Sequence, residues 1–402
     1  MRSLTLDDIL HPCPAQEFLN KIAGHDYLHV PGYPQKFADL FPWTELNHIL
    51  GTHRFGAKGM RMVKDGRAVS QDAFLKDGVV RATEMTDLLR DGATLVLERV
   101  DCMYRPLKEL GESLERVFEV PVQMNMYAGW RVSHGFDVHW DDHDVIVLQI
   151  AGRKHWKIYG VTEQFPVKNS VELGIKPPEK DPVWDGFLER GDVLYMPRGW
   201  WHIAFPVDEP TMHITIGMRY PTGLDLLRFV SGELEQDVRM RIDLQAAGDT
   251  GSRAGVMKGI VDAVTAAIGE PELFERFMKV QRGMASPRPT LGLPWSATAE
   301  VLPDSEDALI RIATLRGYEI ERFEDAIQVA FNGKALTFAA AAEPLFAYIL
   351  ARREFSIGEF CAHFSAEYEQ ETLRGFVADL ARHGLISIGD GHGARASAAD
   401  RS

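Results

Sequence analysis

Two histidines and three aspartates stand within six residues at His139-Trp140-Asp141-Asp142-His143-Asp144, directly before the apolar run VIVLQI. Imidazole nitrogens and carboxylate oxygens are common protein ligands of transition metals. Side chains at i and i+2 of a strand point to one face, so on a strand His139 and Asp141 converge while Asp142 points away. His143 shares their parity, and a bend after Asp141 would remove it. The segment therefore predicts half of a metal site, with Asp142, His143 and Asp144 in supporting or rim positions.

A second segment, GDVLYMPRGWWH, which ends at His202, offers the other half of the site. Its first two residues predict a turn, and VLYM predicts a buried strand. Pro197 and Gly199 predict a second tight turn that aims His202 at the sheet interior. The spacing of these glycine, proline and histidine residues matches the second motif of the cupin barrels, although Pro206 stands where that motif has asparagine.

His139, Asp141 and His202 would together form a facial triad of two histidines and one carboxylate. Such a triad holds non-haem Fe(II) and leaves coordination positions open for a cosubstrate and O2. A His-x-Asp pattern alone is weak, because it recurs by chance, and a lone buried histidine is usually a hydrogen-bonded core residue. The two segments together favour a metal site, since buried charges need a partner or a metal.

Strands must position both segments. Between about residues 93 and 221, short runs rich in β-branched and aromatic residues alternate with Gly, Pro and Asp, which is typical of a sandwich or barrel with little helix. We expect strands within TLVLERV, VPVQMNMYAG, DVIVLQIAG, KHWKIYG, DVLYMPRG and MHITIGMRY. Earlier in the chain, AQEFLNKIAG and WTELNHILG have the apolar spacing of helices and end in glycine.

The remainder of the chain predicts further parts. Residues 222–312 favour helices, including LLRFVSGELEQDVRMRIDLQAAG and ELFERFMKVQRG, with SPRPTLGLPWS as a loop. In residues 313–390, EDAIQVAFNGKALTF predicts a hairpin turned on Asn332-Gly333. Three helical segments and the strand LISI follow, an order that suggests a small winged-helix-like domain. We expect a catalytic domain with a helical and strand-containing N-terminal extension at 1–221, and a disordered tail at 391–402.

Composition excludes several classes of protein. The 402 residues carry a net charge of −14, which argues against non-specific nucleic-acid binding and would attract a basic partner. An apolar run of about 18 residues, as a membrane span needs, is not seen, and the first residues do not resemble a secretory signal. Cys13, Cys102 and Cys361 are far apart and odd in number, as expected of unpaired thiols in a reducing cytosol. We therefore expect a cytoplasmic protein.

The stretch from Gln123 to Tyr220 resembles the JmjC-type ribosomal oxygenases, which are Fe(II)- and 2-oxoglutarate-dependent protein hydroxylases. The segments NMYAGWRVSHGFDVHWDDHDVIVLQIAGRKHWKIYG and GDVLYMPRGWWHIAFP carry this resemblance. It implies a mainly β catalytic core, a double-stranded β-helix of the JmjC/cupin barrel type. A helical dimerisation region and a C-terminal winged helix would follow, so the resemblance also implies a homodimer.

The resemblance assigns roles to individual residues. The three triad residues would bind iron, and Lys154 would bind the distal carboxylate of 2-oxoglutarate from the inner strand face that it shares with Trp156. Without the resemblance, Lys154 would be interpreted as a solvated hairpin lysine. Asn125 and Tyr127 share a strand face and would bond to the cosubstrate or the target, although Tyr127 could equally be a packed strand residue. His213 would lie close to the iron.

The predicted function is hydroxylation of a side chain, Arg or His, in a ribosomal or other basic protein, with Fe(II), 2-oxoglutarate and O2. The alternatives are a JmjC N-methyl demethylase, a hydroxylase of a small molecule or biosynthetic peptide, and a non-catalytic metal-binding cupin scaffold. We expect no direct DNA binding by the C-terminal domain, because the best candidate recognition helix, QETLRGFVADLARHG, is not strongly basic and has Glu367, Glu369 and Glu371 clustered at its start.

Overall fold

The structure is a computed structural model that describes residues 4–131, 135–167, 170, 174–244, 250–284, 288–298, 302–316, 318–331 and 334–389. The chain divides into two compact units, residues 1–286 and 287–402, and each has its own hydrophobic core. This division differs from the boundaries predicted after residues 221 and 312, which stay predictions. The predicted Asn332-Gly333 turn and the predicted tail lie outside the described residues.

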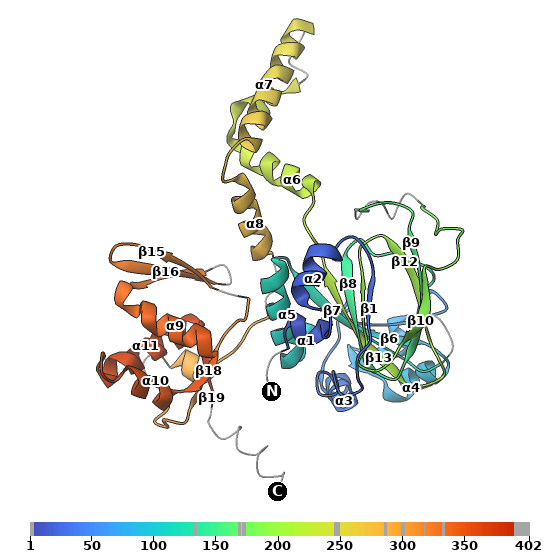
Figure 1. The fold of residues 1–402 in the computed structure, drawn as a ribbon, viewed down its shortest axis with the longest axis horizontal. Coiled ribbons are helices and arrows are strands. Elements are labelled where there is room, and N and C mark those ends of the chain that lie inside the picture. Colours follow the sequence, from blue (N-terminus) through green and yellow to red (C-terminus); the bar gives the residue numbers. More distant parts are fainter. Residues whose placement is uncertain are drawn as a thin grey trace. The chain divides into compact units, whose positions relative to one another are not determined.

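The largest sheet of the first unit is antiparallel and eight-stranded, in the order β1-β11-β8-β13-β7-β6-β2-β3 (Figure 1). Its strand β8 is buried on both faces, with Val145 and Val147 in one apolar cluster and Ile146 and Leu148 in another. Burial on both faces explains why VIVLQI shows no polar alternation. The strands are β1 (Leu28–Val30), β2 (Met60–Lys64), β3 (Arg67–Ala68), β6 (Thr94–Leu97), β7 (Val122–Gly129), β8 (Asp144–Ala151), β11 (Val193–Met196) and β13 (Thr211–Met218).

A three-stranded sheet, β10-β9-β12, faces the large sheet (Figure 1). It consists of β9 (Lys154–Val161), β10 (Trp184–Leu188) and β12 (Trp200–Pro206), and β4 (Leu75–Lys76) pairs separately with β5 (Val79–Val80). Trp156 and Ile158 on β9 join Val145 and Val147 in one buried cluster between the sheets. All six predicted strands are confirmed, whereas β10 and β12 were not predicted as strands. The two facing sheets form the expected sheet-rich core.

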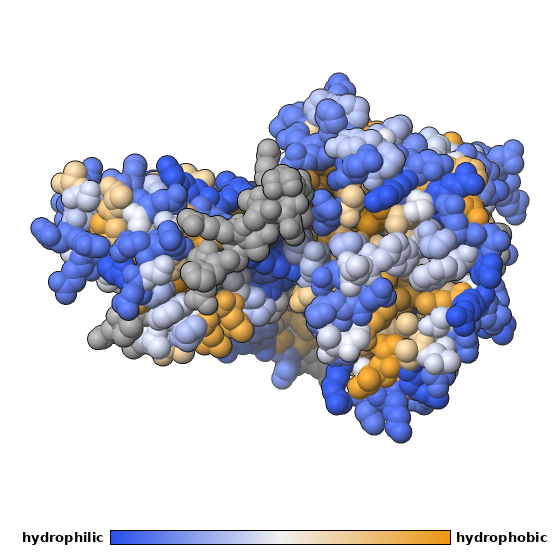
Figure 2. Space-filling view, turned by 90° about the horizontal axis from the view of Figure 1, so that it is seen from below, coloured by the Kyte–Doolittle hydropathy of each residue, from blue (hydrophilic) through white to orange (hydrophobic). Residues whose placement is uncertain are grey.

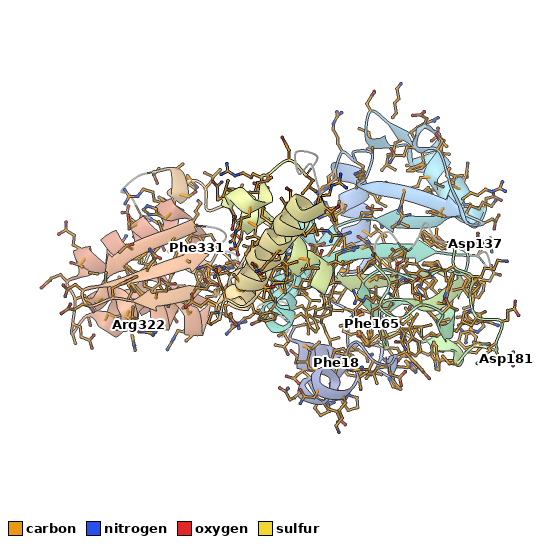
Figure 3. The ribbon with its side chains drawn as sticks, turned by 90° about the horizontal axis from the view of Figure 1, so that it is seen from above. Phe18, Asp137, Phe165, Asp181, Arg322 and Phe331 are labelled. Carbon is orange, nitrogen blue, oxygen red and sulfur yellow. The ribbon has the colours of Figure 1, made fainter. Side chains whose placement is uncertain are left out.

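Helices cover the outer face of the large sheet. Phe18 on α2, labelled in Figure 3, is fully buried, and its ring meets that of Tyr195 edge-on at 4.8 Å. The predicted helices α2 and α3 are confirmed, but α5 contradicts the expectation of little helix between residues 93 and 221. It buries Leu107, Leu110 and Leu114, which have helical spacing. The helices are α1 (Leu6–Leu10), α2 (Ala15–Lys21), α3 (Trp43–Thr52), α4 (Ala82–Arg90) and α5 (Arg105–Phe118).

The last part of the first unit is helical, with α6 (Gly223–Glu233), α7 (Thr250–Ile268) and α8 (Leu273–Gly283). Thr222 and Asp225 form a capping box that begins α6. The helix predicted over LLRFVSGELEQDVRMRIDLQAAG ends at Glu233, and two short 3-10 turns follow it. Among the described residues, no helix is both long enough and apolar enough to cross a membrane. The face seen in Figure 2 is mainly hydrophilic, with smaller apolar areas.

The second unit contains the predicted hairpin, the three predicted helices and the predicted closing strand in the expected order. Its two sheets have the orders β18-β14-β19 and β15-β16-β17, and Phe331 ends β16 (Figure 3). Whether this unit is a winged helix stays a prediction. The elements are β14 (Leu309–Ile312), β15 (Glu319–Arg322), β16 (Ala326–Phe331), β17 (Lys334–Ala339), α9 (Glu343–Arg352), β18 (Glu354–Ser356), α10 (Ile357–Phe364), α11 (Gln370–His383) and β19 (Ile386–Gly389).

Candidate metal centre

A tight turn between β11 and β12 places His202. Gly199 has a φ of +82° in this turn, and a Cβ atom there would lie 2.7 Å from the Pro166 side chain. Both the backbone conformation and the available space therefore require glycine. The N–H of Gly199 donates to the carbonyl oxygen of Asp141 at 2.9 Å. The predicted turn is confirmed, and it connects the two candidate ligand segments.

His139 lies opposite His202 in an isolated antiparallel bridge. Each backbone N–H donates to the carbonyl oxygen of the other residue, at 3.1 and 2.8 Å. The prediction that His139 and Asp141 lie on a regular strand was wrong, because β8 begins only at Asp144 and bends precede it. The local bridge to His202 and the hydrogen bond from Gly199 to Asp141 therefore position His139 and Asp141, in place of side-chain alternation along a regular strand.

The three predicted triad residues converge. One ligand atom each of His139, Asp141 and His202 lies within 4.8 Å of the others, and Asp141 Oδ2 is 3.8 Å from His202 Nε2. His139 Nδ1 lies 2.7 Å from the carbonyl oxygen of Asp137 (labelled in Figure 3), and His202 Nδ1 lies 3.0 Å from that of Trp200. A carbonyl oxygen only accepts, so each Nδ1 carries the proton and each Nε2 presents its lone pair.

The charge state of this cluster suits a cation. Burial and the neighbouring His139 together lower the pKa of His202 to about 4, so His202 is neutral at pH 7 and able to bind a metal. Two imidazoles and one carboxylate match the donor set of a two-histidine, one-carboxylate iron site. The residues present therefore fit a divalent transition metal.

The other acidic and histidine side chains of the HWDDHD segment point elsewhere. Asp142 accepts two hydrogen bonds from the Arg219 guanidinium, at 2.6 and 2.7 Å, and its pKa is lowered by its bonds to His143 and Arg219. The bend removes His143 from the triad, and its ring packs against Gly217. Asp144 is buried, not at a rim, and accepts from the Tyr195 hydroxyl at 2.5 Å.

A cavity of about 190 Å³ adjoins the triad, between the two sheets. Aromatic rings form much of its wall, with Tyr127 stacked on His213 at 4.9 Å and Phe136 edge-on to Tyr127 at 6.0 Å. The lining residues are Arg61, Thr94, Tyr127, Gly135, Phe136, His139, Asp141, Val145, Val147, Lys154, Trp156, Met196, His202, Ala204, His213 and Thr215.

Lys154 lies in this cavity on the inner face of β9, as expected, and the solvated-hairpin interpretation is wrong because the residue is only 7% exposed. Burial lowers the pKa of Lys154 to about 7, and no carboxylate among the described residues offsets this effect. A buried ammonium group without an anion is costly. The cavity is therefore suited to an anionic ligand.

Of the other predicted site residues, Tyr127 and His213 line the cavity and Asn125 does not. Burial and the nearby Asp141 carboxylate raise the pKa of Tyr127 to about 12, so its hydroxyl stays protonated. Burial and the Lys154 charge lower the pKa of His213 well below its usual value. Asn125 Oδ1 accepts from the backbone N–H of Arg99 at 3.0 Å.

Three polar cavity residues were missed by sequence reasoning. They are Arg61 on β2, Thr94 on β6 and Thr215 on β13. The first two come from parts of the chain that no motif singled out. Arg61 also pairs with Glu98 at 2.8 Å and lies over the ring of Phe136. Only the order of strands in the large sheet brings β6 beside β7 and β2 beside β6.

Comparison with known proteins identifies the class. A family model described as JmjC domain matches residues 97–226. The bifunctional lysine-specific demethylase and histidyl-hydroxylase NO66 of Drosophila persimilis is 39% identical over 116 residues, which cover 27% of this chain and 16% of that protein. NO66 of Brugia malayi is 37% identical over 146 residues, covering 33% of this chain and 20% of that protein. The chain thus spans a fifth or less of the length of these two relatives.

A solved structure matches almost the whole chain. The ribosomal oxygenase YcfD of Escherichia coli gives a TM-score of 0.60 at 16% sequence identity, covering 94% of this chain and 98% of that one. YcfD in complex with cobalt and 2-oxoglutarate gives a TM-score of 0.57. At this identity the likeness shows a shared fold. The chain therefore carries a JmjC domain, and the predicted resemblance to the JmjC-type ribosomal oxygenases is confirmed.

Proposed function

We propose that this protein is an Fe(II)- and 2-oxoglutarate-dependent oxygenase that hydroxylates a side chain, Arg or His, of a ribosomal or other basic protein. The observation that carries the proposal is one cavity with a two-histidine, one-carboxylate cluster and a buried lysine that has no anionic partner among the described residues. A metal and a dicarboxylate together would satisfy both features.

The residues of the cavity would have different roles. His139, Asp141 and His202 would hold Fe(II), and Lys154 would hold the distal carboxylate of 2-oxoglutarate. Tyr127 and His213 would contact the cosubstrate or target from the stacked wall. When bound, Fe(II) with 2-oxoglutarate and O2 supplies the oxidation that converts a C–H bond to C–OH, with succinate and CO2 as the other products.

The names of the similar proteins support a protein target. NO66 is named as both a lysine demethylase and a histidyl-hydroxylase, and YcfD as a ribosomal oxygenase. A net charge of −14 would favour encounter with a basic partner. N-methyl demethylation is the second candidate, because the same oxidant removes methyl groups and NO66 carries that name as well.

The test is an assay of the full chain with Fe(II), 2-oxoglutarate, O2 and ribosomal proteins from the source cells. We expect succinate formation that requires Fe(II) and stops in His139→Ala, together with a gain of one oxygen atom on one Arg or His residue. Formaldehyde release without that gain would favour demethylation instead. Succinate formation that survives in His139→Ala would contradict the triad, and metal binding without any turnover would indicate a scaffold.

Further parts of the proposal concern the whole protein. We propose a homodimer formed by the helices of residues 222–312, where Met257, Val261 and Phe274 expose apolar side chains on α7 and α8. We also propose a cytoplasmic location and a substrate-recruiting role for a winged-helix-like second unit. Light scattering of the full chain and of a Val261→Glu variant would test the dimer, since a buried glutamate would dissociate it.

A further inference from the structure

Buried polar side-chain atoms without a hydrogen-bond partner are concentrated in the candidate cavity. Four such atoms occur among the described residues, and three belong to residues that line it: Thr94 Oγ1, Trp156 Nε1 and His213 Nδ1. The fourth is Gln149 Oε1. An unsatisfied buried donor costs about 1–3 kcal/mol, so proteins rarely leave one without a reason. Oxygen atoms of a bound ligand would satisfy the two donors, Thr94 and Trp156.

Trp156 stands between the metal end and the lysine end of the cavity. On β12, the strand partners of Ile158, Trp156 and Lys154 are His202, Ala204 and Pro206. Lys154 and Trp156 share the inner face of β9 and are about 7 Å apart along the strand. The Trp156 ring lies 6.0 Å from the His202 ring, and Lys154 Nζ lies 5.8 Å from the Trp156 ring. A ligand that reaches from the metal to Lys154 therefore passes Trp156.

Thr94 lies near the lysine end, on the opposite sheet. A Cβ atom built on Gly129 would lie 2.9 Å from Pro206 and 3.7 Å from Thr94 Oγ1, so Pro206 and the Thr94 hydroxyl are close neighbours. Pro206 is the strand partner of Lys154. Thr94 is 2% exposed and Trp156 is 4% exposed, so neither donor faces bulk solvent, and a ligand in the cavity that both residues line can accept from both.

We propose that Trp156 and Thr94 are further binding residues for 2-oxoglutarate. The Trp156 N–H donates to an oxygen of the 2-oxo-carboxylate end that faces the metal, and the Thr94 hydroxyl donates to the carboxylate that Lys154 holds. This inference rests on the proposed function above. It places three donors, one on β6 and two on β9, around one dicarboxylate.

The test is calorimetric titration of 2-oxoglutarate into the Co(II)-loaded full chain under anaerobic conditions. Hydrogen bonds to charged groups are worth enough that Trp156→Phe should weaken 2-oxoglutarate binding about 10- to 100-fold, and Thr94→Val about 10-fold. The matched control is Trp201→Phe, because Trp201 Nε1 already donates to Thr162 Oγ1 at 2.7 Å and does not line the cavity. Co(II) affinity should be unchanged in all three variants.

A spectroscopic readout separates direct contact from an indirect effect. In protein labelled with ¹⁵N-tryptophan, the indole signal lost in Trp156→Phe should shift when 2-oxoglutarate is added, while the Trp201 signal stays. A wild-type protein that binds no 2-oxoglutarate would overturn the proposed function itself. If Trp156→Phe and Thr94→Val both bind 2-oxoglutarate as tightly as the wild-type protein does, this inference alone is overturned. Equal losses of Co(II) and 2-oxoglutarate affinity in Trp156→Phe would also overturn it, since Trp156 would then act through His202.

Discussion

Replacing Lys154 by methionine should stabilise the ligand-free protein and at the same time remove most of its affinity for 2-oxoglutarate. Burial lowers the pKa of Lys154 from its usual 10.5 to about 7 in the folded chain. Between about pH 7 and pH 10.5, the unfolded chain binds more protons at this position than the folded chain does. The charged lysine therefore lowers the free energy of unfolding most at pH 7 and below, and less as the pH rises. At about 1.4 kcal/mol per pH unit, the cost is up to about 4 kcal/mol at pH 7 and about 2 kcal/mol at pH 9.

Methionine has a similar length and no charge, so Lys154→Met should recover much of this free energy without leaving a cavity. The same change removes the one unpaired cation of the cavity wall among the described residues. Loss of one partner of a buried charge pair costs about 2–5 kcal/mol, which corresponds to roughly 30-fold to several-thousand-fold weaker 2-oxoglutarate binding. The two effects have opposite signs, which distinguishes them from general damage to the fold.

Urea unfolding of the metal-free protein at pH 7 and pH 9 measures the first effect, with tryptophan fluorescence as the signal. Of the 8 tryptophans only Trp295 lies beyond residue 287, so the signal reports on the first unit. The matched control is Lys157→Met, because Lys157 lies on the outer face of β9 and pairs with Asp185 at 3.2 Å. A Lys154→Met protein less stable than wild type at pH 7, or a gain that grows toward pH 9, would refute the reasoning.

Two other predictions concern the supports of the metal centre. Arg219→Gln should weaken Co(II) binding roughly 10-fold in a calorimetric titration. Loss of a residue that supports a metal ligand typically costs 10- to 100-fold in metal affinity, and Arg219 is half-exposed, so we expect the lower end of this range. Unchanged affinity would show that the ion pair between Arg219 and Asp142 does not position Asp141. Gly217→Ala should lower the free energy of unfolding by about 1–3 kcal/mol, because its Cβ would lie 2.8 Å from the His143 ring. The control is Gly223→Ala, whose Cβ would meet no atom within 4 Å and should leave the free energy of unfolding unchanged. Equal urea midpoints in the two variants would contradict this prediction.

The triad could be predicted from the sequence because its parts lie in two short segments. The tight turn before His202 could be predicted because it contains Pro197 and Gly199, which favour turns. The pair His139 and Asp141 was found by a strand rule that does not apply there, since β8 starts at Asp144. The three side chains nevertheless converge, because the bridge to His202 gives His139 a local extended pairing. The bend that removes His143 from the site was stated in the sequence analysis only as a condition, since nothing in the sequence predicted it.

The remainder of the cavity could not be predicted, because it depends on contacts between distant strands. Thr94 and Arg61 reach the cavity through the pairing of β6 with β7 and β2 with β6. Neither residue belongs to a motif, and a threonine at the start of an apolar strand is ordinary. Helix α5 was missed because its buried leucines are separated by charged residues in a region interpreted as strands. Asn125 follows the strand parity of Tyr127, but its Oδ1 accepts from the backbone N–H of Arg99 and the residue does not line the cavity.

The two ends of the cavity differ in how many of their polar groups have hydrogen-bond or charge partners. This difference implies an order in which the metal and 2-oxoglutarate bind. At the metal end, the bridge between His139 and His202 and the carbonyl partners of both Nδ1 atoms orient the ligands before any ion arrives. At the other end, Lys154 and the Thr94 hydroxyl are buried without partners among the described residues, as is the Trp156 N–H between the two ends. A preorganised end binds without rearrangement, whereas the lysine end gains free energy only from an anion. We therefore expect the metal to bind first, and 2-oxoglutarate to bind the metal-free protein much more weakly than the Co(II)-loaded protein.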